Sequence, residues 1–492
     1  MKPGTTAMGG ATTRQYVVAL GLVFALALYR WLVIWGTQLP LDIEEAYYLH
    51  WAQQPALGYF SKPPMIAWLL AGMTELFGTG ELAIKSLSLL LHTATALVVY
   101  SIGKRLYTAP VGLAAAVVFQ SIPIMGAMSL YSTTDAPLHF FWALTMRLFL
   151  TARDTDRLPW WLLTGLAGGL GMLSKFSMGL LAIGLLLALL ASPRDRRLLR
   201  SPGLWLGVTT VVLCMAPNLW WNQQHDFISF RHTSHIAQLD KDLVHPDHLL
   251  EFLLPQLAVF GPVLFGALLL AVFRRSVWAD ERHRFLLLVS LPILLLISLE
   301  ALLAEANLNW ASPAYIGLGI FVTAWLWEAR RRWLVGGVVF NLVLLSLVYH
   351  YHAVAAGLGV EMRRDRTPYH ARLGWRELGA QVRDWTQAYP QARLTSDSRE
   401  ILALMSYYGA EPGRPLASWN PGGTVKNQFD LEGDVSRYPD APLLFLSAGP
   451  LDASVLRRFR DVRSLGVKRV DVFADLSRQV HGYLLDGFKG YR

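Results

Sequence analysis

A cluster of acids directly follows the first long apolar segment and is the stretch of the chain best suited to chemistry. It contains Asp42, Glu44 and Glu45. Neighbouring carboxylates raise one another's pKa, and a general base that takes a proton from a hydroxyl group needs such a carboxylate. The same acids could instead be solvated loop residues or N-caps of a helix that contains residues 47–51. We therefore treat Asp42, Glu44 and Glu45 as candidate catalytic residues, with capping as the alternative.

Lys62 lies further along the same stretch, directly before Pro63 and Pro64. The prolines stiffen the backbone and fix the direction of the ammonium group, and a lysine is a compact point charge suited to a phosphate. The alternative is a lysine that snorkels at a helix end. Lys175 lies between two apolar runs, where an ionisable residue is a functional candidate by default. Lys62 is thus a candidate phosphate ligand, and Lys175 a second functional residue.

Asp135 and two histidines each allow more than one interpretation. Asp135 stands at an expected helix start, where capping alone would be a more natural role than catalysis. His225 and His232 could bind a divalent metal ion, but their spacing is not a compact zinc pattern and the acids lie far away in the sequence. Walker, dinucleotide-binding and zinc motifs are absent from the sequence. We therefore name no certain cofactor and keep a divalent metal ion as a candidate.

Apolar segments that are long enough to cross a bilayer recur from residue 15 to residue 352. The chain of 492 residues is 53% hydrophobic and only 16% charged, whereas about a quarter of the residues of a soluble protein are charged. The first segment is too long for a signal-peptide core and is expected to be retained. We predict a polytopic α-helical membrane protein with about eleven transmembrane helices, at residues 15–36, 80–102, 109–129, 136–152, 159–173, 177–192, 204–222, 249–273, 285–303, 312–328 and 333–352.

The basic residues are distributed asymmetrically between the two sides of this predicted topology. With a cytoplasmic N-terminus, the clusters at residues 104–105, 153–157, 194–200, 274–284 and 330–332 all fall on the cytoplasmic side, and the opposite loops hold few basic residues. This is the positive-inside pattern, which fixes the orientation. The net charge of +9 comes mostly from these cytoplasmic loops and so reflects the membrane topology. We therefore predict the membrane bilayer as a partner and predict no nucleic acid partner.

Two short spans and a polar C-terminal region complete the predicted organisation. The short spans meet at residues 168–175 and could form a broken hairpin that brings Lys175 to the outer side. We predict two domains, residues 1–355 as a transmembrane domain with outer catalytic loops and residues 356–492 as a small soluble α/β domain on the outer side. Within the latter, helices are expected at residues 375–388 and 401–408, and strands at residues 392–395, 443–446 and 467–473.

Six short pieces of the chain together are similar to one enzyme family. They are EEAYY (44–48), GYFSKPP (58–64), TDAPL (134–138), LSKF (173–176), WNQQHD (221–226) and NWASPA (309–314). On these pieces the chain resembles the membrane-embedded GT-C glycosyltransferases of the dolichyl-phosphate-mannose protein mannosyltransferase family, in its bacterial branch, and the related lipid A aminoarabinose transferases. The resemblance implies a GT-C fold in the bacterial inner membrane with a periplasmic C-terminal domain. It also implies inverting transfer of a sugar from a polyprenyl-phosphate donor to lipid A, another envelope glycan or a protein.

The resemblance also implies roles for individual residues. The family usually has Asp-Glu before Ala-Tyr-Tyr, and here the pair is Glu44–Glu45, so the role of base falls on Glu44, with Asp42 as its substitute. Ser61–Lys62 is similar to the aminoarabinose transferases, in which the lysine contacts the lipid phosphate. The remaining expected site residues are Lys175 and Arg231 at the donor phosphate, and Tyr47, Tyr48, Tyr59, His225, Asn309 and Trp310 at the substrates.

Two other functions fit parts of the pattern. A transporter or flippase of lipid-linked sugars also uses charged residues inside helices and broken helices. It predicts polar residues on both faces of the membrane, whereas here they gather on the outer face, which favours the transferase. A scaffold whose outer domain binds other envelope proteins is a third interpretation, and residues 370–492 do not exclude it.

Overall fold

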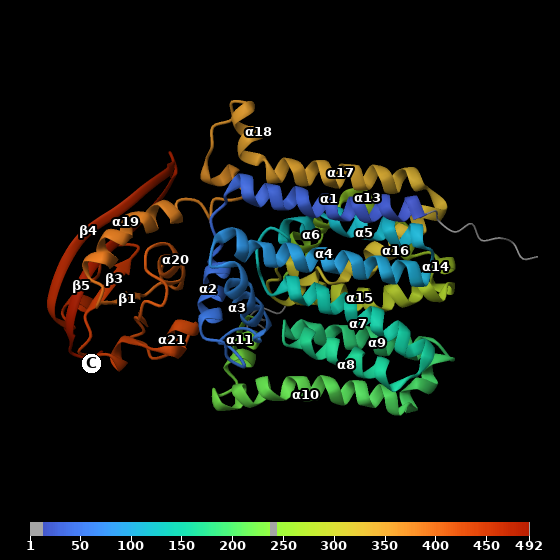
Figure 1. Ribbon diagram of the computed structural model, residues 1–492, viewed down its shortest axis with the longest axis horizontal. Coiled ribbons are helices and arrows are strands. Elements are labelled where there is room, and N and C mark those ends of the chain that lie inside the picture. Colours follow the sequence, from blue (N-terminus) through green and yellow to red (C-terminus); the bar gives the residue numbers. More distant parts are fainter. Residues whose placement is uncertain (1–12, 237–243, 492) are drawn as a thin grey trace, which may run out of the picture.

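The computed structural model describes residues 13–236 and 244–491. Long helices lie side by side along one axis, and a domain that contains a sheet lies across one end of them (Figure 1). The short helices α2 (Ile43–Gln53), α3 (Met65–Phe77) and α11 (Ile228–Ile236) lie between these two parts. The acidic stretch of the sequence is therefore placed where the helical part meets the C-terminal domain.

Five of the described helices contain apolar segments long enough to span a membrane. They are α1 (Thr13–Thr37), α4 (Glu81–Leu106), α10 (Pro202–Gln224), α15 (Glu281–Leu303) and α17 (Arg331–Tyr349). A sixth span exists if the bent pair α12 (Pro246–Phe260) and α13 (Pro262–Val272) is counted as one. The chain is thus a mostly helical membrane protein, as predicted.

The structure corrects the prediction of one continuous span at residues 249–273. Helices α12 and α13 meet there at a bend of 111°. Gly261 between them has a φ of +96°, which residues with a side chain rarely adopt. Pro262 then begins α13, where its missing backbone N–H is not needed. The side chain of Asn341 also occupies the space beside Gly261, so the bend is built into the packing.

The other predicted spans correspond to helices that are shorter or less apolar. These are α5 (Ala109–Ser121) followed by α6 (Pro123–Met128), α7 (Asp135–Thr155), α8 (Leu158–Met172), α9 (Gly179–Ala191) and α16 (Ala314–Ala329). The count of eleven spans therefore stays a prediction. The expected break at residues 168–175 is confirmed, because α8 ends at Met172 and a 3-10 helix (Phe176–Met178) leads from the Lys175 turn into α9.

The C-terminal domain is built on a five-stranded sheet in the order β2-β1-β3-β5-β4. Strand β1 pairs in parallel with β2 and β3, and β5 pairs antiparallel with β3 and β4. The strands are β1 (Arg393–Ser396), β2 (Leu416–Ser418), β3 (Leu443–Ser447), β4 (Phe459–Phe473) and β5 (Leu476–Phe488), and the main helices are α19 (Trp375–Ala388) and α20 (Arg399–Tyr408). Short helices complete the chain: α14 (Arg275–Ala279), α18 (Tyr351–Gly357), α21 (Gln428–Glu432), α22 (Ala453–Leu456) and 3-10 turns at Asp195–Arg200, Leu308–Ala311, Arg364–Arg366 and Val435–Arg437.

The sequence predicted about half of these strands. Strands β1 and β3 and helices α19 and α20 lie within two residues of their expected positions. The strand expected at residues 467–473 is only the end of β4, and β2 and β5 were not predicted. Most side chains of β4 are exposed, so its sequence lacks the apolar signal of a buried strand.

The C-terminal domain packs on the segment that follows α1. Apolar side chains of α2, α3, α19 and α20 form one buried cluster, and the backbone N–H of Leu41 donates a hydrogen bond to the Tyr408 hydroxyl at 2.7 Å. This packing holds the N-terminus of α2 against the domain. The predicted boundary between residues 355 and 356 itself stays a prediction.

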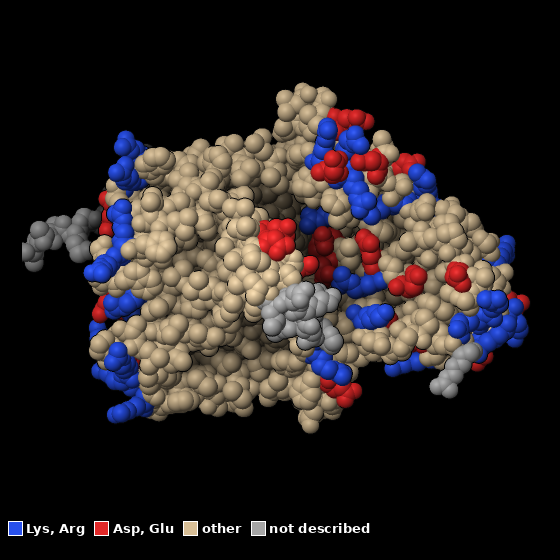
Figure 2. All heavy atoms as spheres, turned by 180° about the vertical axis from the view of Figure 1, so that it is seen from behind, with Lys and Arg blue, Asp and Glu red and all other residues tan. Residues whose placement is uncertain are grey.

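Few charged side chains lie on the surface of the middle of the helical part on the face shown in Figure 2. On the face shown in Figure 2, Lys and Arg gather at one end of the helices, and mixed charges surround the C-terminal domain at the other end. The surface between them carries few charges, as expected for a surface in contact with a bilayer. Which end faces the cytoplasm stays a prediction from the basic loops.

Candidate active site

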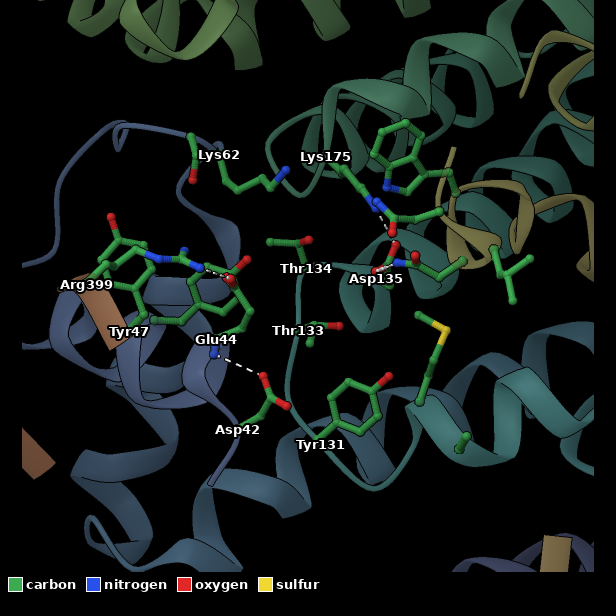
Figure 3. A pocket seen from close by; sticks show the side chains of 18 of the residues that line it. Asp42, Glu44, Tyr47, Lys62, Tyr131, Thr133, Thr134, Asp135, Lys175 and Arg399 are labelled. Atoms are coloured by element: carbon green, nitrogen blue, oxygen red, sulfur yellow. Dashed lines mark hydrogen bonds and ion pairs between the residues drawn. The ribbon is translucent and has the colours of Figure 1, made fainter. Parts of the chain in front are cut away.

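A cavity of about 920 Å³ lies where loops of the helical part meet the C-terminal domain (Figure 3). Its walls come from segments that are far apart in the sequence, including the first loop, the start of α7, the Lys175 turn and three segments of the C-terminal region. The side chains that carry polar groups into the lining are those of Asp42, Glu44, Tyr47, Tyr48, Ser61, Lys62, Tyr131, Thr133, Thr134, Asp135, Lys175, His232, Asn307, Asn309, Trp310, Arg372, Arg399, Lys426 and Asn427.

Asp42 is the N-cap of α2 and also lines the cavity. Its Oδ1 accepts a hydrogen bond from the backbone N–H of Glu44 at 3.1 Å, and its Oδ2 accepts one from Nε of Arg372 at 3.0 Å. The capping alternative is therefore confirmed for Asp42. Both oxygens already have donors, so Asp42 is poorly placed to take a proton from a substrate.

Glu45 lies outside the cavity and is fully buried. Its carboxylate accepts hydrogen bonds from Nζ of Lys85 at 2.6 Å, from the backbone N–H of Ser132 at 2.9 Å and from that of Asp42 at 3.0 Å. A carboxylate enclosed in this way does not reach a substrate. The structure therefore corrects the expectation that Glu45 is catalytic and gives it the role of joining α2 to α4 and to the loop before α7.

Glu44 is the acid of this cluster that is directed to the cavity without capping α2. Its side chain is 35% exposed, and its Oε1 lies 3.0 Å from a guanidinium nitrogen of Arg399. The guanidinium lies over the ring of Tyr47, with 5.0 Å between Cζ and the ring centroid. Burial, together with the Glu44 carboxylate, raises the pKa of Tyr48 well above its usual value, so Tyr48 stays a hydrogen-bond donor.

Lys62 lines the cavity without a partner of its own. Its ammonium group forms no ion pair or hydrogen bond with any residue in the described ranges, and the acids that could have neutralised it, Glu44 and Glu45, are paired with Arg399 and Lys85. Burial lowers the pKa of Lys62 to about 8, and the nearby Lys175 ammonium adds to this effect. A desolvated cation without a counter-ion is a suitable site for an anion.

Asp135, Lys175 and Asn309 form a buried group on the opposite wall. Lys175 Nζ lies 2.7 Å from Oδ1 of Asp135, and Asn309 Nδ2 donates to Oδ2 at 3.0 Å. Asp135 is thus the partner of a lysine and not the N-cap, a position that Thr134 occupies without a side-chain hydrogen bond. The backbone N–H of Met65 also donates to the carbonyl of Leu173 at 3.0 Å, which ties the segment after Lys62 to the Lys175 turn.

Several expected site residues lie elsewhere. Tyr59 is buried against Trp51, with ring centroids 4.5 Å apart, and does not line the cavity. His225 stacks on Trp221 at 4.0 Å and also lies outside the lining. Arg231 is exposed on α11 and outside it. Tyr59, His225 and Arg231 therefore lie outside the cavity, whereas Tyr47, Tyr48, Asn309 and Trp310 line it. The substrate- and phosphate-binding roles of these residues stay predictions.

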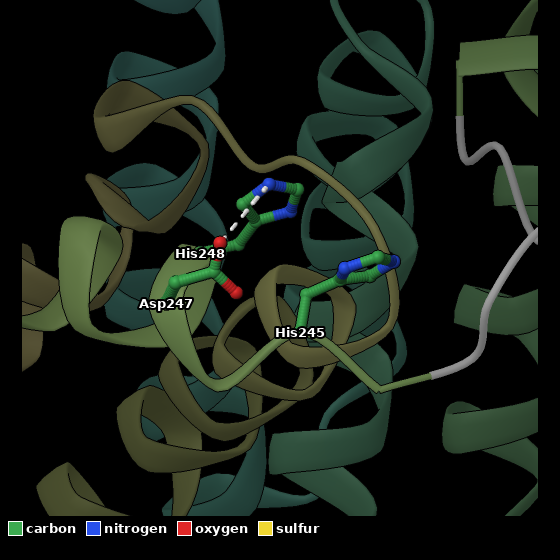
Figure 4. Close-up of side chains that lie close together, drawn as sticks. All are labelled: His245, Asp247 and His248. Carbon is green, nitrogen blue, oxygen red and sulfur yellow. Dashed lines mark ion pairs between the residues drawn. The ribbon is translucent and has the colours of Figure 1, made fainter.

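Only one of the two histidines named as metal candidates lines the cavity. His232 lines the cavity and packs against Phe60 at 4.7 Å, whereas His225 does not line it. Within residues 13–236 and 244–491, the one group of three close metal-ligand side chains is His245, Asp247 and His248 at the start of α12 (Figure 4). It does not line the cavity. A metal site built on His225 and His232 therefore stays a prediction.

The sequence missed the residues that the C-terminal region contributes. Arg372 pairs with Asp42, Arg399 pairs with Glu44, and Lys426 and Asn427 complete the lining. They lie more than 300 residues from the acids along the chain, and polar residues in a soluble domain are ordinary. Only the docking of the C-terminal domain on α2 shows that they belong to the site.

The chain is similar to known proteins over most of its length. Residues 61–221 match the family described as dolichyl-phosphate-mannose-protein mannosyltransferase. The lipid A galacturonosyltransferase RgtD of Rhizobium johnstonii is 31% identical over 444 residues, which cover 87% of this chain and 91% of that protein. The chain belongs to this family of membrane glycosyltransferases. It is therefore an enzyme that transfers a sugar, and the transporter interpretation is set aside.

Further relatives of the transferase agree in sequence and in fold. An undecaprenyl phosphate-alpha-4-amino-4-deoxy-L-arabinose arabinosyl transferase of Pseudomonas fluorescens is 27% identical over 313 residues, which are 59% of this chain and 53% of that protein. The crystal structure of ArnT from Cupriavidus metallidurans bound to undecaprenyl phosphate superposes with a TM-score of 0.67, covering 96% of this chain and 98% of that one, at 16% identity. The transferase thus has the fold of ArnT over almost its whole length.

Proposed function

We propose that the transferase moves a sugar from a polyprenyl-phosphate donor to lipid A on the periplasmic face of the inner membrane, with inversion. The relative that matches almost the full chain is named as a lipid A galacturonosyltransferase. A second relative is named for an undecaprenyl phosphate donor, and a structure with the same fold holds undecaprenyl phosphate. These likenesses support a lipid-linked donor and a lipid acceptor, in preference to a protein or another glycan.

The observation that carries this proposal is an accessible carboxylate and an unpaired lysine in one cavity. Glu44 takes the proton of the acceptor hydroxyl as its oxygen forms a bond to the anomeric carbon of the donor sugar. The bond from that carbon to the phosphate oxygen breaks, and the lipid phosphate leaves with the electron pair. Attack and departure on opposite sides of the carbon invert its configuration.

Lys62 stabilises the leaving phosphate in this mechanism. Negative charge grows on the phosphate as the bond breaks, and a fixed ammonium group beside it lowers the barrier because it interacts most strongly with the transition state. Lys175 lies close enough to Lys62 to lower its pKa, although its own charge is shared with Asp135. Both cations belong to segments joined by the Met65–Leu173 hydrogen bond, so their spacing is fixed before the donor binds.

The acids of the cavity do not form an obvious site for a divalent ion. Each of the three acids in its lining is paired with an arginine or a lysine, namely Asp42 with Arg372, Glu44 with Arg399 and Asp135 with Lys175. We propose that these cations and Lys62 carry the charge neutralisation that a metal ion would otherwise supply. Turnover of the purified enzyme should then survive treatment with EDTA, and restoration of lost turnover by a divalent ion would contradict this part of the proposal.

The decisive experiment measures transfer from a synthetic polyprenyl-phosphate sugar to purified lipid A. Glu44→Gln keeps the shape of the side chain but removes the base, so it should abolish transfer while folding and membrane insertion stay intact. Asp42→Asn should retain more activity, because Asp42 acts mainly as a cap. Near-normal turnover in Glu44→Gln together with a dead Asp42→Asn enzyme would move the base to Asp42. If mass spectrometry shows that lipid A from a deletion strain carries the same sugars as lipid A from the parent strain, the proposal that lipid A is the acceptor is contradicted.

A further inference from the structure

The cavity contains more cationic than anionic side chains. Its acids are fully matched by three ion pairs, which are Asp42–Arg372, Glu44–Arg399 and Asp135–Lys175 with N–O distances of 3.0, 3.0 and 2.7 Å. Two lysines of the lining are left over, Lys62 and Lys426. Neither side chain forms an ion pair or a hydrogen bond with a residue that the structure describes. The cavity thus has two cations available for ligands.

The phosphate that links the lipid to the sugar in the donor supplies only one negative charge before reaction. This phosphodiester charge is the one that the mechanism above assigns to Lys62. We propose that the cavity binds a second anionic group of the substrates and that Lys426 recognises it. This inference rests on the proposed function, because it compares the number of unpaired lysines in the cavity with the single charge of a phosphodiester donor. Lys426 lines the cavity and is exposed, so its ammonium group is free to form a charge-assisted hydrogen bond with an anionic group of a bound substrate.

The backbone around Lys426 is fixed in position relative to the catalytic loop. Oε1 of Gln428 accepts a hydrogen bond from the backbone N–H of Phe60 at 2.8 Å. The backbone N–H of Gln428 donates a hydrogen bond to the Tyr47 hydroxyl. The backbone N–H of Lys426 is held by Asp430 Oδ2 at 2.9 Å. Lys426 is therefore anchored at the rim beside the Phe60–Lys62 segment, while its side chain is exposed and available. Such an arrangement reduces the ordering that a ligand must impose.

Two groups could supply the second anion. One is the carboxylate of a uronic acid as the transferred sugar, and the other is a phosphate on the lipid acceptor. The name of RgtD refers to a galacturonosyl group, whose sugar carries such a carboxylate. A cation at this position would also disfavour a sugar that bears an ammonium group, such as the aminoarabinose in the names of other relatives. The chemistry shared by both sources is an anion beside the reacting carbon.

The test compares two synthetic donors that differ in one group. Polyprenyl phosphate galacturonate and polyprenyl phosphate galactose are assayed with purified full-length enzyme, each with lipid A that carries or lacks its phosphates. We expect the wild type to prefer the galacturonate, and Lys426→Gln to reduce the ratio of the two kcat/KM values by about tenfold to a hundredfold, the range of a charge-assisted hydrogen bond. The control is Lys468→Gln, since Lys468 lies on β4 of the same domain and pairs with Asp384 at 2.9 Å.

Each outcome separates this inference from the proposed function. A loss in Lys426→Gln that follows the donor carboxylate supports the inference with the sugar as the source, and a loss that follows the acceptor phosphate supports it with lipid A as the source. The inference is overturned, while the wild type still transfers sugar, if Lys426→Gln changes neither the preference between the two donors nor the preference for phosphorylated lipid A. It is also overturned if the loss follows neither group or is equally large in Lys468→Gln. A wild type that transfers from no polyprenyl-phosphate donor overturns the proposed function and this inference with it.

Discussion

The alkaline limb of the pH profile should report the charge of Lys62. Burial, and then the ammonium group of Lys175, lower the pKa of Lys62 from 10.5 to about 8, although the nearby carboxylates of Asp135 and Glu44 oppose this. Only the protonated amine binds and stabilises a phosphate. Because the pKa is lowered in the folded enzyme, the charge is present below about pH 8 and is lost as the pH rises through that value. Activity that depends on this charge should be lost in the same interval.

The size of the effect follows from this pKa. Roughly nine in ten Lys62 side chains are protonated at pH 7 and roughly one in ten at pH 9, so kcat/KM for the donor should fall about tenfold between these values. Lys62→Arg keeps its charge throughout this range. It should be less active than the wild type at pH 7, because a planar guanidinium places its donors differently, but it should lack the alkaline decline. Bound phosphate favours the protonated lysine, so the decline of kcat should begin at a higher pH than that of kcat/KM.

Initial rates with a synthetic polyprenyl-phosphate sugar, measured across this pH range in detergent, test the prediction. Lys62→Ala serves as the variant without a cation and should be slow even at saturating donor. Thermal unfolding of the same preparations separates a lost charge from a damaged loop. A flat wild-type profile up to pH 9, an equal decline in Lys62→Arg or full turnover in Lys62→Ala would each refute the phosphate role. Loss of stability in step with activity would favour a structural role for Lys62.

Three further predictions concern stability, the base and the orientation. Lys85→Met should lower the free energy of unfolding by about 3–5 kcal/mol, because it leaves the buried Glu45 carboxylate unpaired, and adding Glu45→Gln should restore part of it; an unchanged melting temperature in Lys85→Met would argue against this pair. Arg399→Gln should lower kcat/KM by about tenfold while the fold stays intact, because the Glu44 carboxylate loses its ion pair and becomes mobile. Unaltered kinetics would show that this contact is dispensable. A reporter that is active only outside the cytoplasm should be active after His350 and silent after Arg197, and activity after Arg197 would reverse the orientation.

The sequence determined the membrane class and the local chemistry of the first outer loop. Long apolar runs have few alternatives to membrane helices, and an acid directly before a helical stretch can cap it, as Asp42 does. Lys62 was recognised because the two prolines after it fix the backbone locally. The lengths of the helices were less certain, since a single glycine with positive φ at residue 261 divides one apolar run into two helices.

Only the tertiary structure decided which of the neighbouring acids faces the substrate. Glu44 and Glu45 are equivalent in the sequence, but adjacent side chains on a helix point about 100° apart, so one reaches the cavity and the other pairs with Lys85 in the core. The same is true of Arg399, whose ion pair with Glu44 joins residues that the sequence separates by a whole membrane domain. Ion pairs depend on the distance between charged atoms in space, and that distance is set by how the C-terminal domain packs against α2.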